Sequence, residues 1–349
     1  TAPFVTDAIR KRCENEVLGY TGKPDSYYNA IINWVKQRYD LIVTKEVINF
    51  VPGIVPGIGM AMNCFTQKGD KVMIQPPVYH PFAWVTTRNE RTLVINPLKW
   101  ENGMYRMDLD AFREQIKGCK LFILCNPHNP GGVVWTEAEL RAIADICYDE
   151  KVLVFSDEIH ADLTLPPHTH RPFATVSEKA RMNSVTFMSP SKAFNMPGLS
   201  ASHALIFNED LRKRFRIYMD AGELDMGHVF AFLSVEAAYS HGTEWLDQCL
   251  AYIQGNIDFV DEFLKKHAPK IKAIRPEASY LVWLDCRELE LSQKDLNEFF
   301  VDKAHLALND GEMFGKEGIG FMRLNVASPR CIIEKAMKQL ADAYQLYIK

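Results

Sequence analysis

The chain has 349 residues, 47% of them hydrophobic, which is enough to bury one large core and a smaller second one. Its 40 basic and 44 acidic residues leave a formal net charge of −4, which argues against nucleic acid or an anionic membrane as the main ligand. No apolar run approaches the roughly 18 to 20 residues that cross a bilayer, and the N-terminus lacks the pattern of a signal peptide. We therefore expect a small-molecule ligand and a cytoplasmic location.

The first part of the chain predicts two helices, a strand and a loop. A helix is expected over residues 7–17, and a stronger one begins near Pro24. A short strand over 47–51 leads into a glycine-rich loop, which lets the backbone approach a ligand closely, and then into a buried helix over 58–65. The start of that helix offers amide groups to a phosphate, although this pattern by itself favours an ordinary strand-to-helix turn.

Apolar runs alternating with helical patterns then predict a mostly parallel sheet that is sandwiched by helices. After a long helix over 243–267, the C-terminal part predicts a smaller α+β domain. We expect residues 23–242 to form the large domain and residues 1–22 plus 243–349 the small one. The strands expected in the large domain are 71–75, 121–125, 152–155 and 184–188; in the small domain we expect strands 280–285 and 321–326, a helix over 292–304 and a final helix.

Lys192 follows the end of the apolar run 184–188, which is the position where an open α/β sheet places its chemistry. A lysine amine at this position can form a Schiff base with a carbonyl cofactor. The flanking hydroxyls of Ser189 and Ser191 can hold a phosphate beside it. A solvated loop lysine is the alternative, so the assignment depends on the neighbouring strand ends.

Those neighbouring ends carry the groups that a pyridine ring requires. Asp157 can pair with the ring nitrogen, whereas Glu158 should point the opposite way, because adjacent strand residues alternate in direction. Tyr79 can stack on the ring, and Asn129 and His160 can hydrogen-bond its phenolic oxygen. Taken singly, these three could also be a core aromatic, a turn residue and a core histidine.

The residues match a known family when they are taken in order. Nearly the whole chain resembles the fold type I pyridoxal-phosphate enzymes of the class I and II aminotransferase superfamily. The matching segments are Tyr79, 126–131, 157–160, 189–192 and 323–327. Within that superfamily, segments 156–160, 166–173 and 318–325 look like the bacterial cystathionine β-lyases of the MalY/PatB type.

The resemblance implies a role for each matched residue. Lys192 would carry pyridoxal 5'-phosphate, Asp157 would pair with the pyridinium, Tyr79 would stack on the ring and Asn129 would bind its oxygen. Arg323 would bind the substrate carboxylate, for which its planar fork is suited. Without the resemblance, Arg323 could equally form an ion pair on the surface of a strand.

The chain departs from the pattern at Ser200, where many aminotransferases of this fold have a phosphate-binding arginine eight residues after the lysine. We therefore expect other groups to bind the phosphate, namely Ser189, Ser191 and the amides around Val55, Pro56 and Gly57. The resemblance also implies that Tyr20 reaches the neighbouring subunit's phosphate site, which predicts a homodimer with shared active sites. Family members usually carry an Asp-Met-Asp-Phe stretch before the position of Thr1, and it lines the substrate site.

The expected reaction is β-elimination on a sulfur amino acid, which gives pyruvate, ammonia and a thiol. Lys192 would remove the Cα proton as the general base. Transamination on the same cofactor is the alternative enzyme activity. A cofactor-binding regulatory partner of a transcription factor is the alternative from another class.

Two other patterns are predicted to be unrelated to catalysis. His160, His168 and His170 could suggest a metal site, but the loop is rich in proline and lacks a nearby acidic or cysteine ligand, so we expect a solvated loop and no metal. The eight cysteines are scattered without a C-x-x-C pair and are expected to be buried, reduced thiols.

Overall fold

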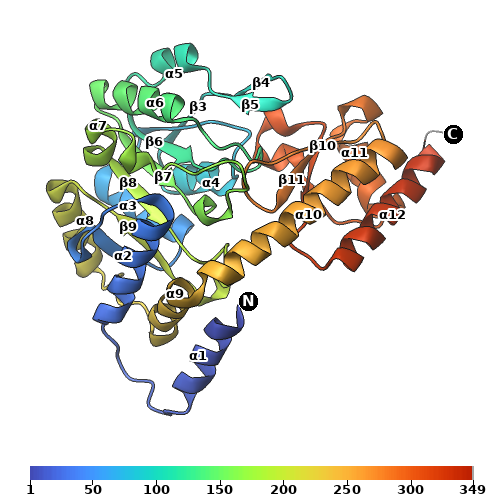
Figure 1. The fold of residues 1–349 in the computed structure, drawn as a ribbon. Helices are drawn as coiled ribbons and strands as arrows, with labels where there is room; N and C mark the ends of the chain where they lie inside the picture. Colours follow the sequence, from blue (N-terminus) through green and yellow to red (C-terminus); the bar gives the residue numbers. More distant parts are fainter. Residues whose placement is uncertain (348–349) are drawn as a thin grey trace.

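The computed structural model describes residues 1–347, and its larger half is built on a seven-stranded sheet (Figure 1). The strand order is β1-β9-β8-β7-β6-β2-β3, and β9 alone runs antiparallel to its neighbours. The predicted mostly parallel sheet is confirmed. Its strands are β1 (Ile48–Val51), β2 (Lys71–Ile74), β3 (Thr92–Ile95), β6 (Cys119–Cys125), β7 (Leu153–Asp157), β8 (Ser184–Met188) and β9 (Ser202–Leu205).

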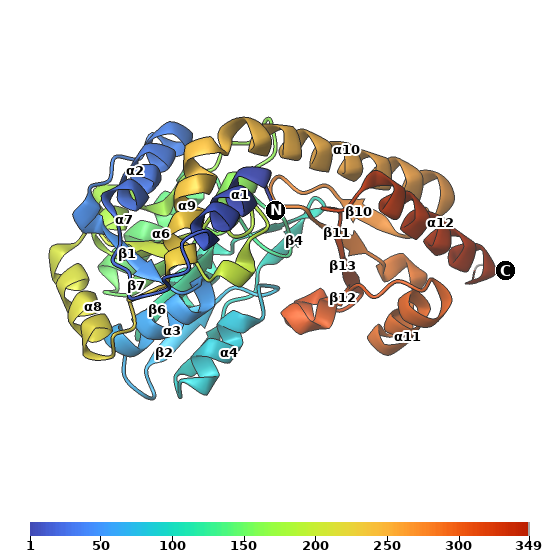
Figure 2. The same ribbon diagram turned by 90° about the horizontal axis from the view of Figure 1, so that it is seen from below.

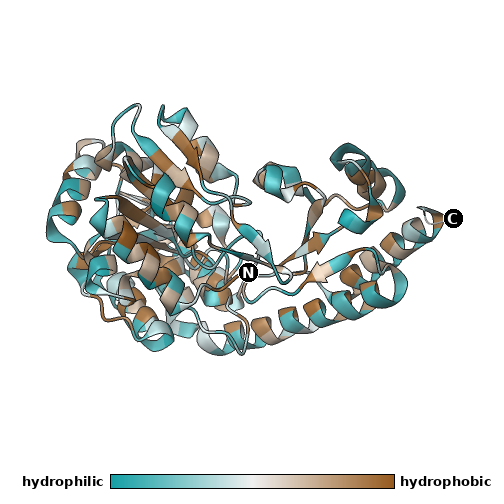
Figure 3. Cartoon of the chain, turned by 90° about the horizontal axis from the view of Figure 1, so that it is seen from above, coloured by the Kyte–Doolittle hydropathy of each residue, from teal (hydrophilic) through white to brown (hydrophobic). Residues whose placement is uncertain are grey.

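Helices cover both faces of this sheet because its central strands are apolar on both faces. On β6, Leu121 and Ile123 pack into one core, whereas Phe122 and Leu124, which point the opposite way, pack into another. The first core contains α3 (Ile54–Phe65), α4 (Pro81–Arg88) and α8 (Glu209–Ala221); the second contains α5 (Leu109–Gln115), α6 (Glu137–Asp149) and α7 (Glu178–Met182). Figure 3 shows hydrophobic strands between helices that carry bands of both colours.

A smaller antiparallel sheet follows in the order β10-β11-β13-β12. Figure 2 shows it beside the large sheet, with α10 running from one to the other. This part contains α10 (Thr243–His267), β10 (Lys272–Ile274), β11 (Leu281–Asp285), α11 (Gln293–Glu298), β12 (Asn309–Asp310), β13 (Phe321–Asn325) and α12 (Arg330–Tyr347). The remaining elements are α1 (Pro3–Cys13), α2 (Asp25–Tyr39), α9 (Val229–His241) and the hairpin of β4 (Lys99–Glu101) and β5 (Met104–Arg106).

Two helix boundaries differ from the sequence prediction. Helix α3 begins at Ile54 rather than 58, because Pro56 lies in the first turn, where its missing N–H breaks no helical hydrogen bond. The helix predicted over 292–304 is an α-helix only to Glu298 and continues as a π-helical turn over Phe299–Lys303.

The N-terminal helix also differs from its prediction. It spans Pro3–Cys13 rather than 7–17, and Pro3 provides a favourable helix start. Helix α1 packs against α9, and the Phe4 ring lies 6.2 Å from the Phe194 ring. It therefore contacts the half of the chain that holds the large sheet, and the Phe4 ring also lies 6.4 Å from the Trp245 ring of α10.

The cysteine prediction is correct in part. All eight cysteines are unpaired, and four of them are buried. Cys13 and Cys331 are exposed, however, because they lie at the solvent end of α1 and on the outer face of α12. Within residues 1–347, no helix is long and apolar enough to cross a membrane.

Candidate active site

The carboxyl ends of the parallel strands meet at a cavity of about 520 Å³ between the two sheets. Asp157 ends β7 and pairs in register with Cys125 on one side and Phe187 on the other, so the segments after β6, β7 and β8 converge there. The cavity wall includes nine of the predicted site residues, namely Tyr79, Asn129, Asp157, His160, Ser191, Lys192, Arg323, Val55 and Pro56.

Lys192 is half-buried in the turn after β8, and its side chain lines the cavity. Burial lowers the pKa of its ammonium group and the nearby Arg323 guanidinium lowers it further, while Asp157 acts in the opposite direction. A lysine with a depressed pKa is more often present as the free amine, which is the nucleophilic and basic form.

Ser189 lies in the same turn, but it does not line the cavity. Its hydroxyl donates to the carbonyl of Ala201 at 2.8 Å and accepts from the backbone N–H of Ser191 at 3.1 Å. Of the two serines, only Ser191 lines the cavity, while Ser189 fixes the backbone that carries Lys192.

Asp157 is a buried carboxylate with few partners. Burial raises its pKa to about 7, although the backbone N–H of Ile159 donates to it at 3.1 Å. A carboxylate in this setting is stabilised by any cation that enters the cavity, and a protonated ring nitrogen is one such group.

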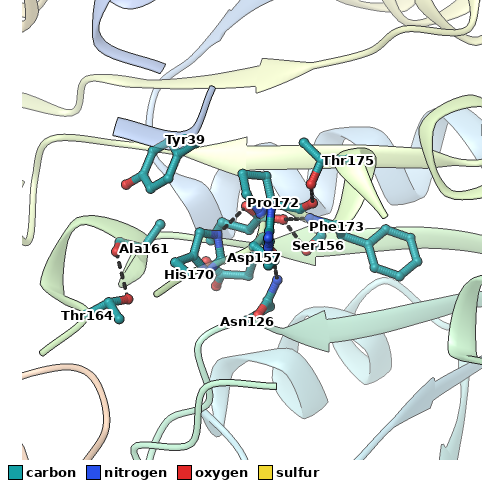
Figure 4. A network of polar contacts seen from close by, with 12 residues as sticks. Tyr39, Asn126, Ser156, Asp157, Ala161, Thr164, His170, Pro172, Phe173 and Thr175 are labelled. Carbon is teal, nitrogen blue, oxygen red and sulfur yellow. Dashed lines mark hydrogen bonds and ion pairs between the residues drawn. The ribbon is translucent and has the colours of Figure 1, made fainter. Parts of the chain in front are cut away.

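Glu158 does not line the cavity and belongs to a separate buried network, whose members Ser156, His170 and Phe173 are labelled in Figure 4. Its Oε1 accepts from the Ser156 hydroxyl and from the Phe173 backbone N–H, each at 2.8 Å. Its Oε2 lies 2.8 Å from His170 Nε2. The alternation predicted for the two carboxylates is therefore correct. The predicted solvated loop is wrong for His170, which is buried against this very carboxylate, and the reasoning that no acidic group lies nearby is wrong as well.

No group of three or more His, Cys, Asp or Glu side chains that could hold a metal ion occurs within residues 1–347. Of His160, His168 and His170, only His160 lines the cavity, and its ring lies 6.3 Å from the Tyr280 ring. Burial, together with Lys192 and Arg323, lowers its pKa to about 3, so the imidazole is neutral. Its Nδ1 is buried and finds no hydrogen-bond partner among the described residues, which makes it available to a ligand.

Arg323 reaches the cavity from β13 of the small sheet. Its Nη1 donates to Asn129 Oδ1 and its Nη2 to Asn309 Oδ1, each at 2.8 Å. Burial lowers the pKa of this guanidinium to about 10, which leaves it charged at neutral pH. Because Asn129 accepts from Arg323 through its oxygen, its amide NH₂ remains free to donate to a ligand oxygen.

The start of α3 offers the cavity fewer free backbone N–H groups than the sequence predicted. Pro56 has no N–H, and the N–H of Gly57 donates to Gly53 at 2.9 Å within the helix. Gly57 also packs against Val51 and does not line the cavity. Ile54 and Val55, in the first turn, carry the amides without helical partners.

Tyr20 lies outside the cavity of its own chain and is 97% exposed. Sequence reasoning also missed several residues of the cavity wall, among them Ser202, Tyr280, Asn309 and Asn325. No local motif marks them, because they are brought to the cavity by the docking of the small sheet and by the antiparallel strand β9.

The chain belongs to the aminotransferase class I and II family, whose sequence model matches residues 3–340. Within that family it belongs with the PatB-type proteins. It is 37% identical to the cystathionine beta-lyase PatB of Bacillus subtilis, over 97% of this chain and 88% of PatB.

Solved structures agree with this assignment. Cystalysin of Treponema denticola, which contains pyridoxal 5'-phosphate, superimposes with a TM-score of 0.96 at 34% identity, over 100% of this chain and 89% of cystalysin. The PLP-bound C-S lyase of Staphylococcus hominis superimposes with a TM-score of 0.91 at 33% identity, over 98% of this chain and 88% of that one. The predicted resemblance and fold are confirmed.

Proposed function

We propose that the protein is a pyridoxal 5'-phosphate-dependent carbon–sulfur lyase that acts by β-elimination on cystathionine or cysteine-type substrates. The observation that carries the proposal is the joint presence of Lys192, Asp157, Tyr79 and Arg323 on the wall of one cavity. PatB, which is named a cystathionine beta-lyase, and the Staphylococcus C-S lyase support the same reaction.

The residues of the cavity fit this cofactor. Lys192 would hold its aldehyde carbon, Asp157 its ring nitrogen, and the NH₂ group of Asn129 with the unpartnered His160 Nδ1 its phenolic oxygen. Tyr79 would cover a face of the ring. The remaining wall groups that suit the phosphate are the first amides of α3, at Ile54 and Val55, and the Ser191 hydroxyl.

When bound, pyridoxal phosphate withdraws electrons and so stabilises negative charge at the substrate Cα. Asp157 keeps the proton on the ring nitrogen, because a carboxylate beside that nitrogen favours its charged form. Arg323 binds the substrate carboxylate and thereby orients the Cα–H bond. The Lys192 amine removes that proton while the Cβ–S bond breaks, and the sulfur takes up a proton and leaves as the thiol. Water then hydrolyses the released aminoacrylate to pyruvate and ammonia.

The test is to incubate the protein with its cofactor and cystathionine or cysteine and to measure pyruvate and thiol. Lys192→Ala should abolish release, and Lys179→Ala, on the surface, should not. Pyruvate at the wild-type rate from Lys192→Ala would refute the assignment.

Transamination is the second candidate, because the matching family model is that of the aminotransferases. It is measured by transfer of the amino group from alanine or glutamate to a 2-oxoacid. Transfer that outpaces pyruvate release from every sulfur amino acid tested would favour this candidate. The comparisons offer no support for a regulatory partner of a transcription factor.

We further propose that residues 23–242 form the cofactor domain, that residues 1–22 plus 243–349 form the small domain, and that two chains share their active sites through Tyr20. The high exposure of Tyr20, at 97%, supports a role for it in a second chain. All eight cysteines are unpaired, which supports a location in a reducing compartment such as the cytoplasm.

A further inference from the structure

Residues 309–315, here named the strap, contact Arg323 in two ways. The strap consists of β12, the short helical turn η7 (Gly311–Phe314) and Gly315. At its start, Asn309 accepts a hydrogen bond from Arg323 Nη2 at 2.8 Å. Near its end, the buried Phe314 ring lies face-on to the guanidinium, 4.6 Å from its central carbon. A hydrogen bond and a ring face together fix both the rotation and the plane of the guanidinium.

The strap also contacts the loop that carries Tyr79. The backbone N–H of Val78 donates to the carbonyl of Phe314 at 2.9 Å. Gly315, with φ of +124°, lies so close to this loop that an added Cβ would be 2.8 Å from Cβ of Pro76. The same seven residues thus connect a side chain of the small sheet with a loop of the large one.

We propose that the strap is a positioning device for the substrate carboxylate: Asn309 and Phe314 hold the Arg323 guanidinium in its binding orientation, and the Phe314 carbonyl fixes that orientation relative to Tyr79. The proposal rests on the proposed function only in taking Arg323 as the carboxylate ligand. Arg323 Nε is buried and has no partner among the described residues, so a donor remains for a ligand after Asn129 and Asn309 are bound.

The test compares two ligands on the cofactor-loaded protein by calorimetry. The first, 3-(methylthio)propionate, has the carboxylate and thioether of a substrate but no amino group; the second, 3-(methylthio)propanol, lacks the carboxylate. The variants are Asn309→Ala, at an exposed position, and Phe314→Leu, which keeps an apolar side chain in the core. The control is Phe259→Leu, because the Phe259 ring contacts Arg330 in the same manner, at 4.8 Å, away from the cavity.

We expect the wild type to bind the carboxylate more tightly than the alcohol. Asn309→Ala and Phe314→Leu should each weaken carboxylate binding by about threefold to tenfold. Binding of the alcohol and the absorbance of the bound cofactor should stay unchanged in both, and Phe259→Leu should match the wild type.

Undiminished carboxylate binding in both variants would overturn the proposal, as would an equal loss for both ligands, which would indicate a general disturbance of the cavity. If Phe314→Leu unfolds, Asn309→Ala decides alone. A wild type that does not distinguish the two ligands would instead refute the role of Arg323 in the proposed function.

Discussion

Asp157 and Glu158 are consecutive in the chain, yet Asp157 lines the cavity and Glu158 is buried against His170 in a network behind it. The two carboxylates therefore have different tasks. Asp157 has a single hydrogen-bond donor at 3.1 Å, which suits a group that awaits a ligand, whereas Glu158 is saturated by its neighbours.

Glu158→Gln is expected to destabilise the fold. A glutamine keeps the shape but cannot accept at both ends, so one buried partner loses its acceptor, and we expect a cost of about 1–3 kcal/mol in the free energy of unfolding. Urea unfolding of the cofactor-free protein measures this cost, with the exposed Glu262→Gln as control. Equal stability of Glu158→Gln and wild type would show that the network does not stabilise the fold.

Asp157→Asn should act in the opposite direction on the cofactor-free protein. The pKa of Asp157 is raised by burial to about 7, so ionisation of this carboxyl in the folded state costs stability as the pH rises from the unfolded-state pKa near 4 through 7. We expect the Asn variant to be more stable than wild type at pH 8, by on the order of 4 kcal/mol, and similar at pH 4.

The same variant should bind pyridoxal phosphate far more weakly, because it loses the partner of the ring nitrogen. Unfolding curves at pH 4 and pH 8 and titration of the cofactor check both halves of this prediction. A pH-independent stability difference would show that Asp157 titrates normally in the folded chain.

Arg323→Lys should raise KM for the amino-acid substrate by about 10- to 100-fold, with a smaller effect on kcat. Lysine retains the charge but loses the planar fork that Asn129 and Asn309 hold. Steady-state kinetics measure the change. Arg330→Lys is the matched control, because it also lies over a phenylalanine ring but away from the cavity. An unchanged KM would mean that the carboxylate binds elsewhere.

Tyr20 allows a test of shared active sites by subunit mixing. If Tyr20 completes the partner's site, then Tyr20→Ala and Lys192→Ala proteins should each lack activity alone. After unfolding and refolding together, the mixed dimers should recover part of it, because one of their two sites has both residues. No recovery in verified mixed dimers would show that Tyr20 does not act in the partner's site.

The sequence predicted the strand ends better than the surroundings of the site. The residue after a buried parallel strand necessarily lies at the carboxyl edge of the sheet, so Asp157 and Lys192 could be located from apolar runs alone. The occupied amide of Gly57 depends on where α3 begins, and Pro56 concealed that start.

Contacts between distant segments were not predictable. The partner of His170 is Glu158, twelve residues away around a proline-rich loop, and that of Arg323 is Asn309 on a neighbouring strand. Composition and periodicity predict local structure, but they do not predict which loop packs against which strand.

The central claim is that Lys192 is the residue that carries the cofactor. Borohydride reduction of the cofactor-loaded protein fixes pyridoxal phosphate to the amine that holds it, and mass spectrometry of the peptides then locates it. We predict the added mass on the peptide that contains Lys192, with none there after Lys192→Ala. The added mass on another lysine, or no covalent cofactor in the active protein, would contradict the account.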